Sequence, residues 1–260
     1  VTSKIPDSDI VGDFDVQAGN VTFINGTTAA SIFIHEKATV TVKSGTYTQI
    51  INWGKTTIQG GKIVNKKYSA ICNYKGTLVV NKVTARANYN CIYAEAGTVT
   101  VNGGSYKSAN TQTKYPLIFS EKATIYLKGG SYTATNAAAV YNENGKITIS
   151  GGNYRGNSGT HWGMITNCKT MSIKGGTFTN SGYLYALFCA EKSSTVVSGG
   201  KFTLKGSIIR AGYGRKKLLI NGGTFNAQSI LICEADDLNV KMDKSKIKLV
   251  GDTRTTTMFV

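Results

Sequence analysis

The sequence predicts an all-β fold, a right-handed parallel β-helix solenoid of about ten coils, with about 22 residues and three short strands per coil. Three observations predict it. A pattern of about twelve residues, clearest in 95–106, recurs along the chain. Apolar residues alternate within each copy, and a Gly-Gly pair ends most of the alternating runs. No stretch has sustained helical periodicity.

Each copy accounts for one coil. Val99 and Val101 alternate with polar residues, and the other copies keep this period of two, which is typical of a strand with one buried face. The following Gly-Gly pair supplies the positive φ that a sharp corner needs. An aromatic residue two positions later begins a second strand, and an apolar run such as 117–119 forms the third. Because the hexapeptide period of left-handed β-helices is absent, we expect right-handed winding.

We expect one domain over residues 1–260, since only Pro6 and Pro116 occur and no linker divides the chain. Residues 1–30 do not fit the repeat and are expected to form an N-terminal cap or an irregular first coil. Residues 31–250 form the repeat coils. Residues 251–260 form a C-terminal end without a polar cap, so we expect the natural chain to continue or another chain to cover this end.

The repeat Glu/Asn-x-x-Thr/Lys-Val/Ile-x-Val/Ile-x-Gly-Gly-x-Tyr/Phe resembles the GGTF-type repeats of bacterial surface and secreted proteins. Over roughly residues 30–250 the chain is also similar to the pectate-lyase-like superfamily of β-helices. The resemblance implies the fold and an extracellular or cell-surface location. It does not select an activity, because that superfamily includes lyases, hydrolases, tailspikes and adhesins.

The composition limits the classes of partner that we expect. The chain has 30 Lys+Arg against 14 Asp+Glu, a formal net charge of +16, which favours an acidic polymer. Only five of these basic residues are arginine, so specific nucleic-acid binding is not expected. The five cysteines are widely spaced and are expected to be small core residues. No apolar run reaches the roughly 18 residues of a membrane span.

No metal or cofactor is expected. The lyases of the superfamily usually hold calcium in an aspartate cluster with a lysine or arginine base. In this chain no aspartate occurs between Asp15 and Asp236. The resemblance therefore does not extend to the calcium-dependent lyases, although a metal-free lyase stays open.

Two sets of equivalent residues are expected to stack from coil to coil. The first, an aromatic ladder, is expected to fill the interior, with a surface platform for sugars as the alternative. It comprises Tyr106, Tyr132, Tyr154, Phe178, Phe202 and Phe225. The second includes Asn52, Glu95, Glu121, Glu143 and Asn167 and is expected to be one corner position whose carboxylate or amide accepts backbone N–H groups. Its alternative is a pair of carboxylates for glycoside hydrolysis.

Two insertions, 107–116 and 155–163, are expected to leave the rod from the same edge. The candidate ligand-binding residues in them are Lys114, Tyr115, Arg155, His161 and Trp162. Tyrosine and tryptophan rings stack on sugars, while lysine and arginine bind carboxylate or sulfate. His161 has the titration range of a general base, and with Arg155 it is the catalytic candidate. The alternative is that both loops project without a ligand.

These observations favour a non-catalytic extracellular module of a bacterial surface or secreted protein, either adhesin-like or glycan-binding. Its expected partner is a polysaccharide or a host or cell-surface glycan. The alternative is a polysaccharide lyase or glycoside hydrolase that acts on an acidic glycan at the two insertions. A purely structural spacer is the third class.

Overall fold

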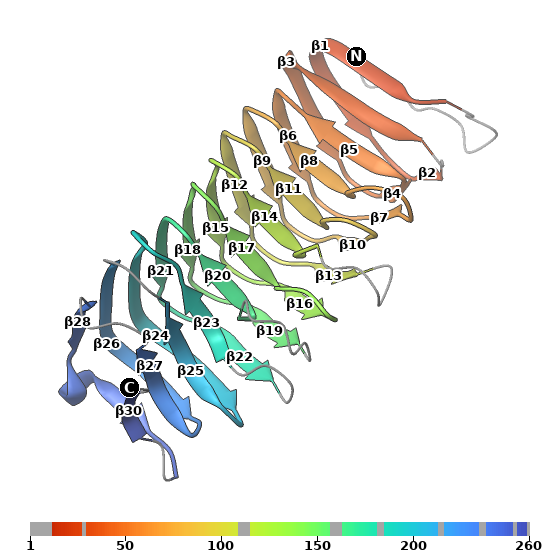
Figure 1. Ribbon diagram of the computed structural model, residues 1–260. Helices are drawn as coiled ribbons and strands as arrows, with labels where there is room; N and C mark the ends of the chain where they lie inside the picture. Colours follow the sequence, from red (N-terminus) through yellow and green to blue (C-terminus); the bar gives the residue numbers. More distant parts are fainter. Residues whose placement is uncertain are drawn as a thin grey trace.

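The computed structural model describes residues 12–27, 30–108, 115–156, 163–180, 185–212, 216–233, 238–251 and 254–258. Within them the chain forms a rod of stacked turns, with the first strand at one end and the last strands at the other (Figure 1). The prediction of an all-β parallel β-helix is confirmed. About nine turns of roughly 22 residues lie between the end strands, and the fold matches the right-handed parallel β-helix in kind.

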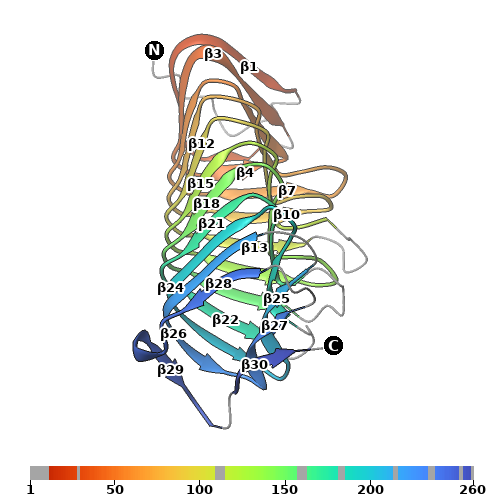
Figure 2. The same cartoon turned by 60° about the vertical axis from the view of Figure 1, so that its left-hand side comes forward.

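Each turn contributes one strand to each of three parallel ladders, which enclose a common interior (Figure 2). Ladder 1 comprises the first parts of β1 (Phe14–Phe23) and β3 (Ser31–Val42), then β5 (Gln49–Asn52), β8 (Ile71–Asn73), β11 (Ile92–Ala94), β14 (Ile118–Ser120), β17 (Val140–Asn142), β20 (Ile165–Asn167), β23 (Tyr185–Cys189), β25 (Ser207–Ala211), β27 (Ser229–Cys233) and β30 (Arg254–Met258).

Ladder 2 follows in every turn. It comprises the second parts of β1 and β3, β6 (Lys55–Ile58), β9 (Thr77–Val80), β12 (Thr98–Val101), β15 (Thr124–Leu127), β18 (Lys146–Ile149), β21 (Thr170–Ile173), the first parts of β24 (Ser194–Leu204) and β26 (Lys216–Asn226), and β28 (Leu238–Met242). Its outward residues are rich in threonine, which suits a half-exposed strand.

Ladder 3 follows the Gly-Gly corner. It comprises β2 (Gly26–Thr27), β4 (Gly45–Tyr47), β7 (Lys62–Asn65), β10 (Thr84–Ala87), β13 (Ser105–Ser108), β16 (Ser131–Ala134), β19 (Asn153–Gly156), β22 (Thr177–Asn180), the second parts of β24 and β26, and β29 (Ile247–Leu249). A short 3₁₀ helix, Lys244–Lys246, precedes β29. The chain then crosses to ladder 1 of the next turn.

The aromatic ladder lies in the interior, as predicted. Its rings are at most 1% exposed, and consecutive centroids are 4.6–5.1 Å apart with planes within 11° of parallel. The tyrosine hydroxyls are satisfied, because Tyr132 donates to the Gly129 carbonyl at 2.8 Å and Tyr106 and Tyr154 do the same three residues back. This position is therefore core, and the alternative of a surface platform is wrong for it.

The second predicted ladder is wrong in its register, because it mixes two neighbouring positions. Asn52, Asn142 and Asn167 end ladder 1 strands and are fully buried. Glu95 and Glu121 lie one residue later, outside the core, on a surface corner. An amide can be buried here because it both donates and accepts: Asn167 Oδ1 accepts from Asn142 Nδ2 at 2.8 Å, and Asn167 Nδ2 donates to Thr195 Oγ1 at 2.8 Å. A carboxylate only accepts and stays in water.

Cys72, Cys91 and Cys168 are free thiols, and Cys189 Sγ donates to Thr195 Oγ1 at 3.4 Å. Cys91 and Cys189 are core residues, as predicted, whereas Cys72 is buried outside ladder 1 and Cys168 is half-buried. Loss of hydration raises the pKa of the Cys72 thiol to about 11 and that of Cys91 to about 12.

We therefore expect Cys72 and Cys91 to resist alkylation in the native protein at pH 8, where both stay protonated because their pKa values lie above that pH. Brief treatment with iodoacetamide, followed by peptide mass spectrometry, measures this. The same treatment in urea is the control and should label both residues fully. Rapid native labelling of either thiol would contradict the burial described for it.

Candidate binding face

The structure covers only part of the predicted site. Lys114, His161 and Trp162 lie outside the described residues. Tyr115 is 47% exposed in the connection between β13 and β14, and Arg155 is exposed on β19. Both lie on the ladder 3 side of the rod, two turns apart. The proposed assembly of the two insertions into one site stays a prediction.

Ladder 3 presents a row of basic side chains to water. Its strands alternate, so the residues beside the buried aromatic ladder point outward. Arg86 and Lys107 are direct partners on β10 and β13, and Arg155 continues the same column on β19. From β4 to β24, the exposed basic residues on the ladder 3 strands are Lys62, Arg86, Lys107, Arg155 and Lys201. We call the outer surface of ladder 3 and its two corners, from β4 to β24, the basic face.

The two corners extend this row. The exposed lysines before the ladder 3 strands are Lys43, Lys82, Lys128 and Lys174, and those after them are Lys66, Lys67 and Lys205. Among the described residues of the basic face there is no aspartate or glutamate. Within this part of the surface, therefore, the positive charge has no neighbouring carboxylate to offset it.

The acidic residues of these same turns gather at the opposite corner, between ladders 1 and 2. They are Glu36, Glu95, Glu121, Glu143 and Glu191. Some are engaged there: Lys75 donates to Glu36 at 2.8 Å, which holds the pKa of that carboxyl below its ordinary value, and Tyr93 donates to Glu121 at 2.7 Å. Lysines such as Lys75, Lys122 and Lys192 lie beside these glutamates, so this corner carries both signs of charge, whereas the described residues of the basic face carry positive charge alone.

The uncompensated positive charge of the basic face has an electrostatic consequence. Neighbouring turns are about 4.8 Å apart, and two like charges at that spacing repel by nearly 1 kcal/mol in water. A row of such charges attracts anions along its whole length, and a polymeric anion releases the small counterions that gather there. The basic face is therefore better suited to an extended polyanion than to a single small anion.

No family model matches the chain, nor does any curated protein or solved structure. The parallel β-solenoid is thus established by the structure itself, and membership of the GGTF-repeat or pectate-lyase-like groups stays a resemblance. No helix in the described residues combines the length and apolar character needed to cross a membrane.

A second aromatic row, which sequence reasoning missed, lies outside ladder 1. It runs through His35, Trp53, Tyr74, Tyr93, Phe119 and Tyr141, with centroids of successive rings 5.1–5.9 Å apart. Except at Tyr74 and Tyr93, the rings stack nearly parallel, so their faces cover one another and mainly their edges meet water. We interpret this row as packing that stabilises the outside of ladder 1.

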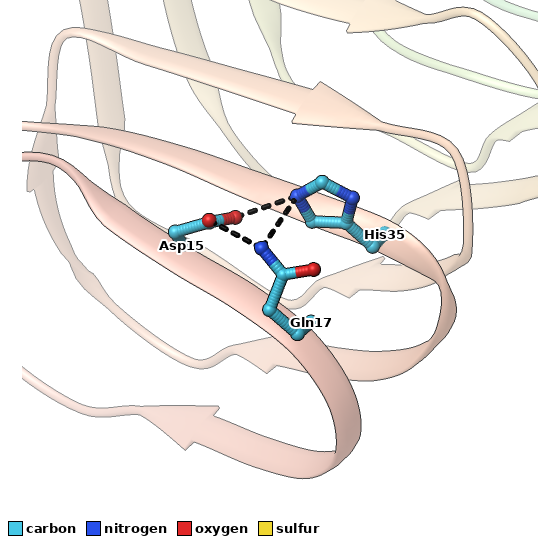
Figure 3. A network of polar contacts seen from close by, with 3 residues as sticks. All are labelled: Asp15, Gln17 and His35. Atoms are coloured by element: carbon cyan, nitrogen blue, oxygen red, sulfur yellow. Dashed lines mark hydrogen bonds and ion pairs between the residues drawn. The ribbon is translucent and has the colours of Figure 1, made fainter.

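One polar network involves a histidine (Figure 3). Asp15 Oδ1 lies 2.6 Å from His35 Nε2, and Gln17 donates to the other oxygen of Asp15. The His35 ring also stacks on Trp53, so both the ring position and one ring nitrogen are committed to local contacts. Because Asp15 is on β1 and His35 is on β3, the network ties the first strand to the second turn.

Proposed function

We propose that this protein is a non-catalytic extracellular module of a bacterial surface or secreted protein and that it binds acidic polysaccharide along the basic face. The observation that carries the proposal is the unbalanced charge of the basic face: its described residues include exposed lysine and arginine but no carboxylate, while the glutamates of these turns lie at the opposite corner among lysines. A uniform distribution of charged residues would place carboxylates on this face as well. The arrangement instead favours a long anionic partner on one face.

The spacing of the turns supports a polysaccharide in particular. An extended glycan carries its anionic groups about one sugar ring apart, which is comparable to the step of about 4.8 Å between turns. The phosphates of an extended single-stranded nucleic acid lie further apart. The strands and corners of the basic face together also present far more lysine than the arginine forks that read bases. An acidic glycan can therefore meet one basic residue on successive turns, such as Arg86 and Lys107.

The regularity of the face favours binding over catalysis. Hydrolysis of a glycosidic bond uses two carboxyl groups at a defined separation, and the described residues of the basic face contain no carboxylate. The alternative of a lyase or hydrolase depends on His161 and Arg155, of which only Arg155 is described. The experiment below therefore measures binding and chain cleavage together.

We expect the triple variant Lys62→Glu, Arg86→Glu and Lys107→Glu to bind heparin, used as the acidic glycan, at least tenfold more weakly than the parent protein. Each reversal removes one favourable contact and adds a repulsive one. The slope of log affinity against log salt should also fall, by about one for each cation lost from the interface. Interferometry with immobilised heparin at several salt concentrations measures both.

The matched control reverses three exposed lysines on ladder 2, Lys55, Lys146 and Lys217, which share one outward column. Both triples lower the net charge equally, so we expect the control to bind heparin within about threefold of the parent protein. Equal weakening by the two triples would contradict a specific face. Heparin recovered from the parent protein should keep its length, and shortening would contradict the non-catalytic proposal.

A further inference from the structure

Three tyrosines lie at the corner where ladder 3 leads to ladder 1. Tyr68, Tyr89 and Tyr115 follow β7, β10 and β13, which are successive rungs of ladder 3. Their rings touch: the centroids of Tyr68 and Tyr89 are 6.0 Å apart and nearly perpendicular, and those of Tyr89 and Tyr115 are 4.3 Å apart. Tyr68 is 48% exposed and Tyr115 is 47% exposed, while Tyr89 is half-buried between them. We call this set the tyrosine corner.

Buried amides hold the backbone beneath the tyrosine corner. Asn65 is 3% exposed, and its Oδ1 accepts from the backbone N–H groups of Lys67 and Tyr68 at 2.9 and 2.7 Å. Asn90 is 7% exposed and donates to the Pro116 carbonyl at 2.6 Å. Because these bonds fix the chain on either side of the rings, the rings are presented to water from a rigid support. A preorganised aromatic surface loses little entropy when a ligand binds.

The tyrosine corner lies beside the densest part of the basic face. Lys67 Nζ is 5.3 Å from the centre of the Tyr68 ring. The same three turns carry exposed Lys62, Arg86 and Lys107. Apolar ring surface and positive charge thus occur together on β7, β10 and β13. The next turn, that of β16, has neither a tyrosine at this corner nor a basic residue on the strand.

We infer that the tyrosine corner is a stacking subsite for the sugar rings of the acidic glycan that the basic face binds. This inference rests on the proposed function and adds the ligand class: a polymer of pyranose rings that bear anionic groups, in contrast to a polyanion without rings. The C–H face of a pyranose packs against Tyr68 or Tyr115, and its sulfate or carboxylate then reaches the cations of β10 and β13. Base stacking by single-stranded DNA is the competing possibility that the test separates.

The test compares three labelled probes: a heparin oligosaccharide, long-chain polyphosphate and oligo(dT). For the double variant Tyr68→Ala and Tyr115→Ala we expect the affinity for heparin to fall about tenfold, since two aromatic contacts are lost. The affinity for polyphosphate should change less than about twofold, because no charge is removed. Both side chains are exposed, so the variant should fold, and its melting temperature checks this.

Two controls define the role of the rings. Tyr68→Phe with Tyr115→Phe keeps the ring surface and should bind heparin as the parent protein does. Tyr126→Ala removes a half-exposed tyrosine from the outside of ladder 2 and should have no effect. An equal loss of polyphosphate and heparin affinity in the alanine variant would overturn the inference, as would a phenylalanine variant as weak as the alanine variant.

The two proposals fail in different ways. If the charge-reversal triple binds heparin normally, the proposed function is wrong. If the triple loses binding but the tyrosine double variant does not, only the stacking subsite is wrong. If oligo(dT) binds the parent protein more tightly than heparin and depends on the two tyrosines, the tyrosine corner accepts bases and the assignment to sugar rings is overturned.

Discussion

Tyr132→Ala is expected to lower the free energy of unfolding by about 3–5 kcal/mol, because it opens a cavity in the middle of the interior stack. The Tyr132 ring is fully buried and stacks on Tyr106 at 4.9 Å and on Tyr154 at 4.6 Å. Without this ring, Tyr106 and Tyr154 each lose a stacking contact, and the packing between their turns is weakened. Urea unfolding followed by circular dichroism gives the change in stability.

Two further variants show whether the loss of stability depends on the position of the tyrosine or on the type of residue at that position. Tyr126 lies on β15 of the same turn but faces outward, so we expect Tyr126→Ala to lower the free energy of unfolding by less than about 1 kcal/mol. Tyr132→Phe keeps the ring and loses the hydroxyl, which donates to the Gly129 carbonyl, so the expected loss is about 1 kcal/mol. Phenylalanine already occupies this position at Phe178 and Phe202. Similar losses for Tyr132→Ala and Tyr126→Ala would contradict the interior stack.

Gly97→Ala is the second large effect that we expect, with a loss of about 3–5 kcal/mol from backbone strain and overpacking together. Gly97 has φ +75°, and a Cβ there would lie 2.2 Å from the carbonyl oxygen of Gly76 in the preceding turn. Because backbone meets backbone at this corner, neither turn can move aside without opening the ladders. Urea unfolding again measures the change.

Gly19 provides the matched control for Gly97. It has a similar φ, +82°, but no atom lies within 4 Å of the place where a Cβ would stand. Gly19→Ala should therefore show only the conformational cost of about 1–2 kcal/mol. The difference between the two variants isolates the close approach of successive turns, and equal losses would mean that the turns are not packed as closely as described.

The repeat predicted the fold because every copy places the same types of residue at the positions that form the strand, the corner and the core of a turn. The period of two at Val99 and Val101 corresponds to a strand. The Gly-Gly pair corresponds to a corner, and the aromatic residue that follows corresponds to a core side chain. The register of the polar corner between ladders 1 and 2 was harder to predict from the sequence. Asn142 and Glu143 are adjacent, and one is core while the other is surface, so an alignment with a one-residue shift looks equally regular.

The candidate site was predictable only in part. Arg155 and Tyr115 were predicted from the two long insertions, and both lie on the ladder 3 side. Arg86 and Tyr68 lie in coils of ordinary length, where no insertion draws attention to them. Their proximity depends on how connections of unequal length bring one turn into register with the next, which composition and periodicity do not encode. For the same reason, the sequence alone did not predict that the described residues of the basic face would include no carboxylate.

Lysine footprinting with heparin bound tests the central claim most directly, because it reports which surface of the unmodified protein the glycan covers. Brief acetylation followed by peptide mass spectrometry gives the reactivity of each lysine with and without heparin. The account predicts that Lys62, Lys82 and Lys107 become several-fold less reactive while Lys55 and Lys146 do not change. Equal protection on both faces, or protection confined to ladder 2, would contradict it.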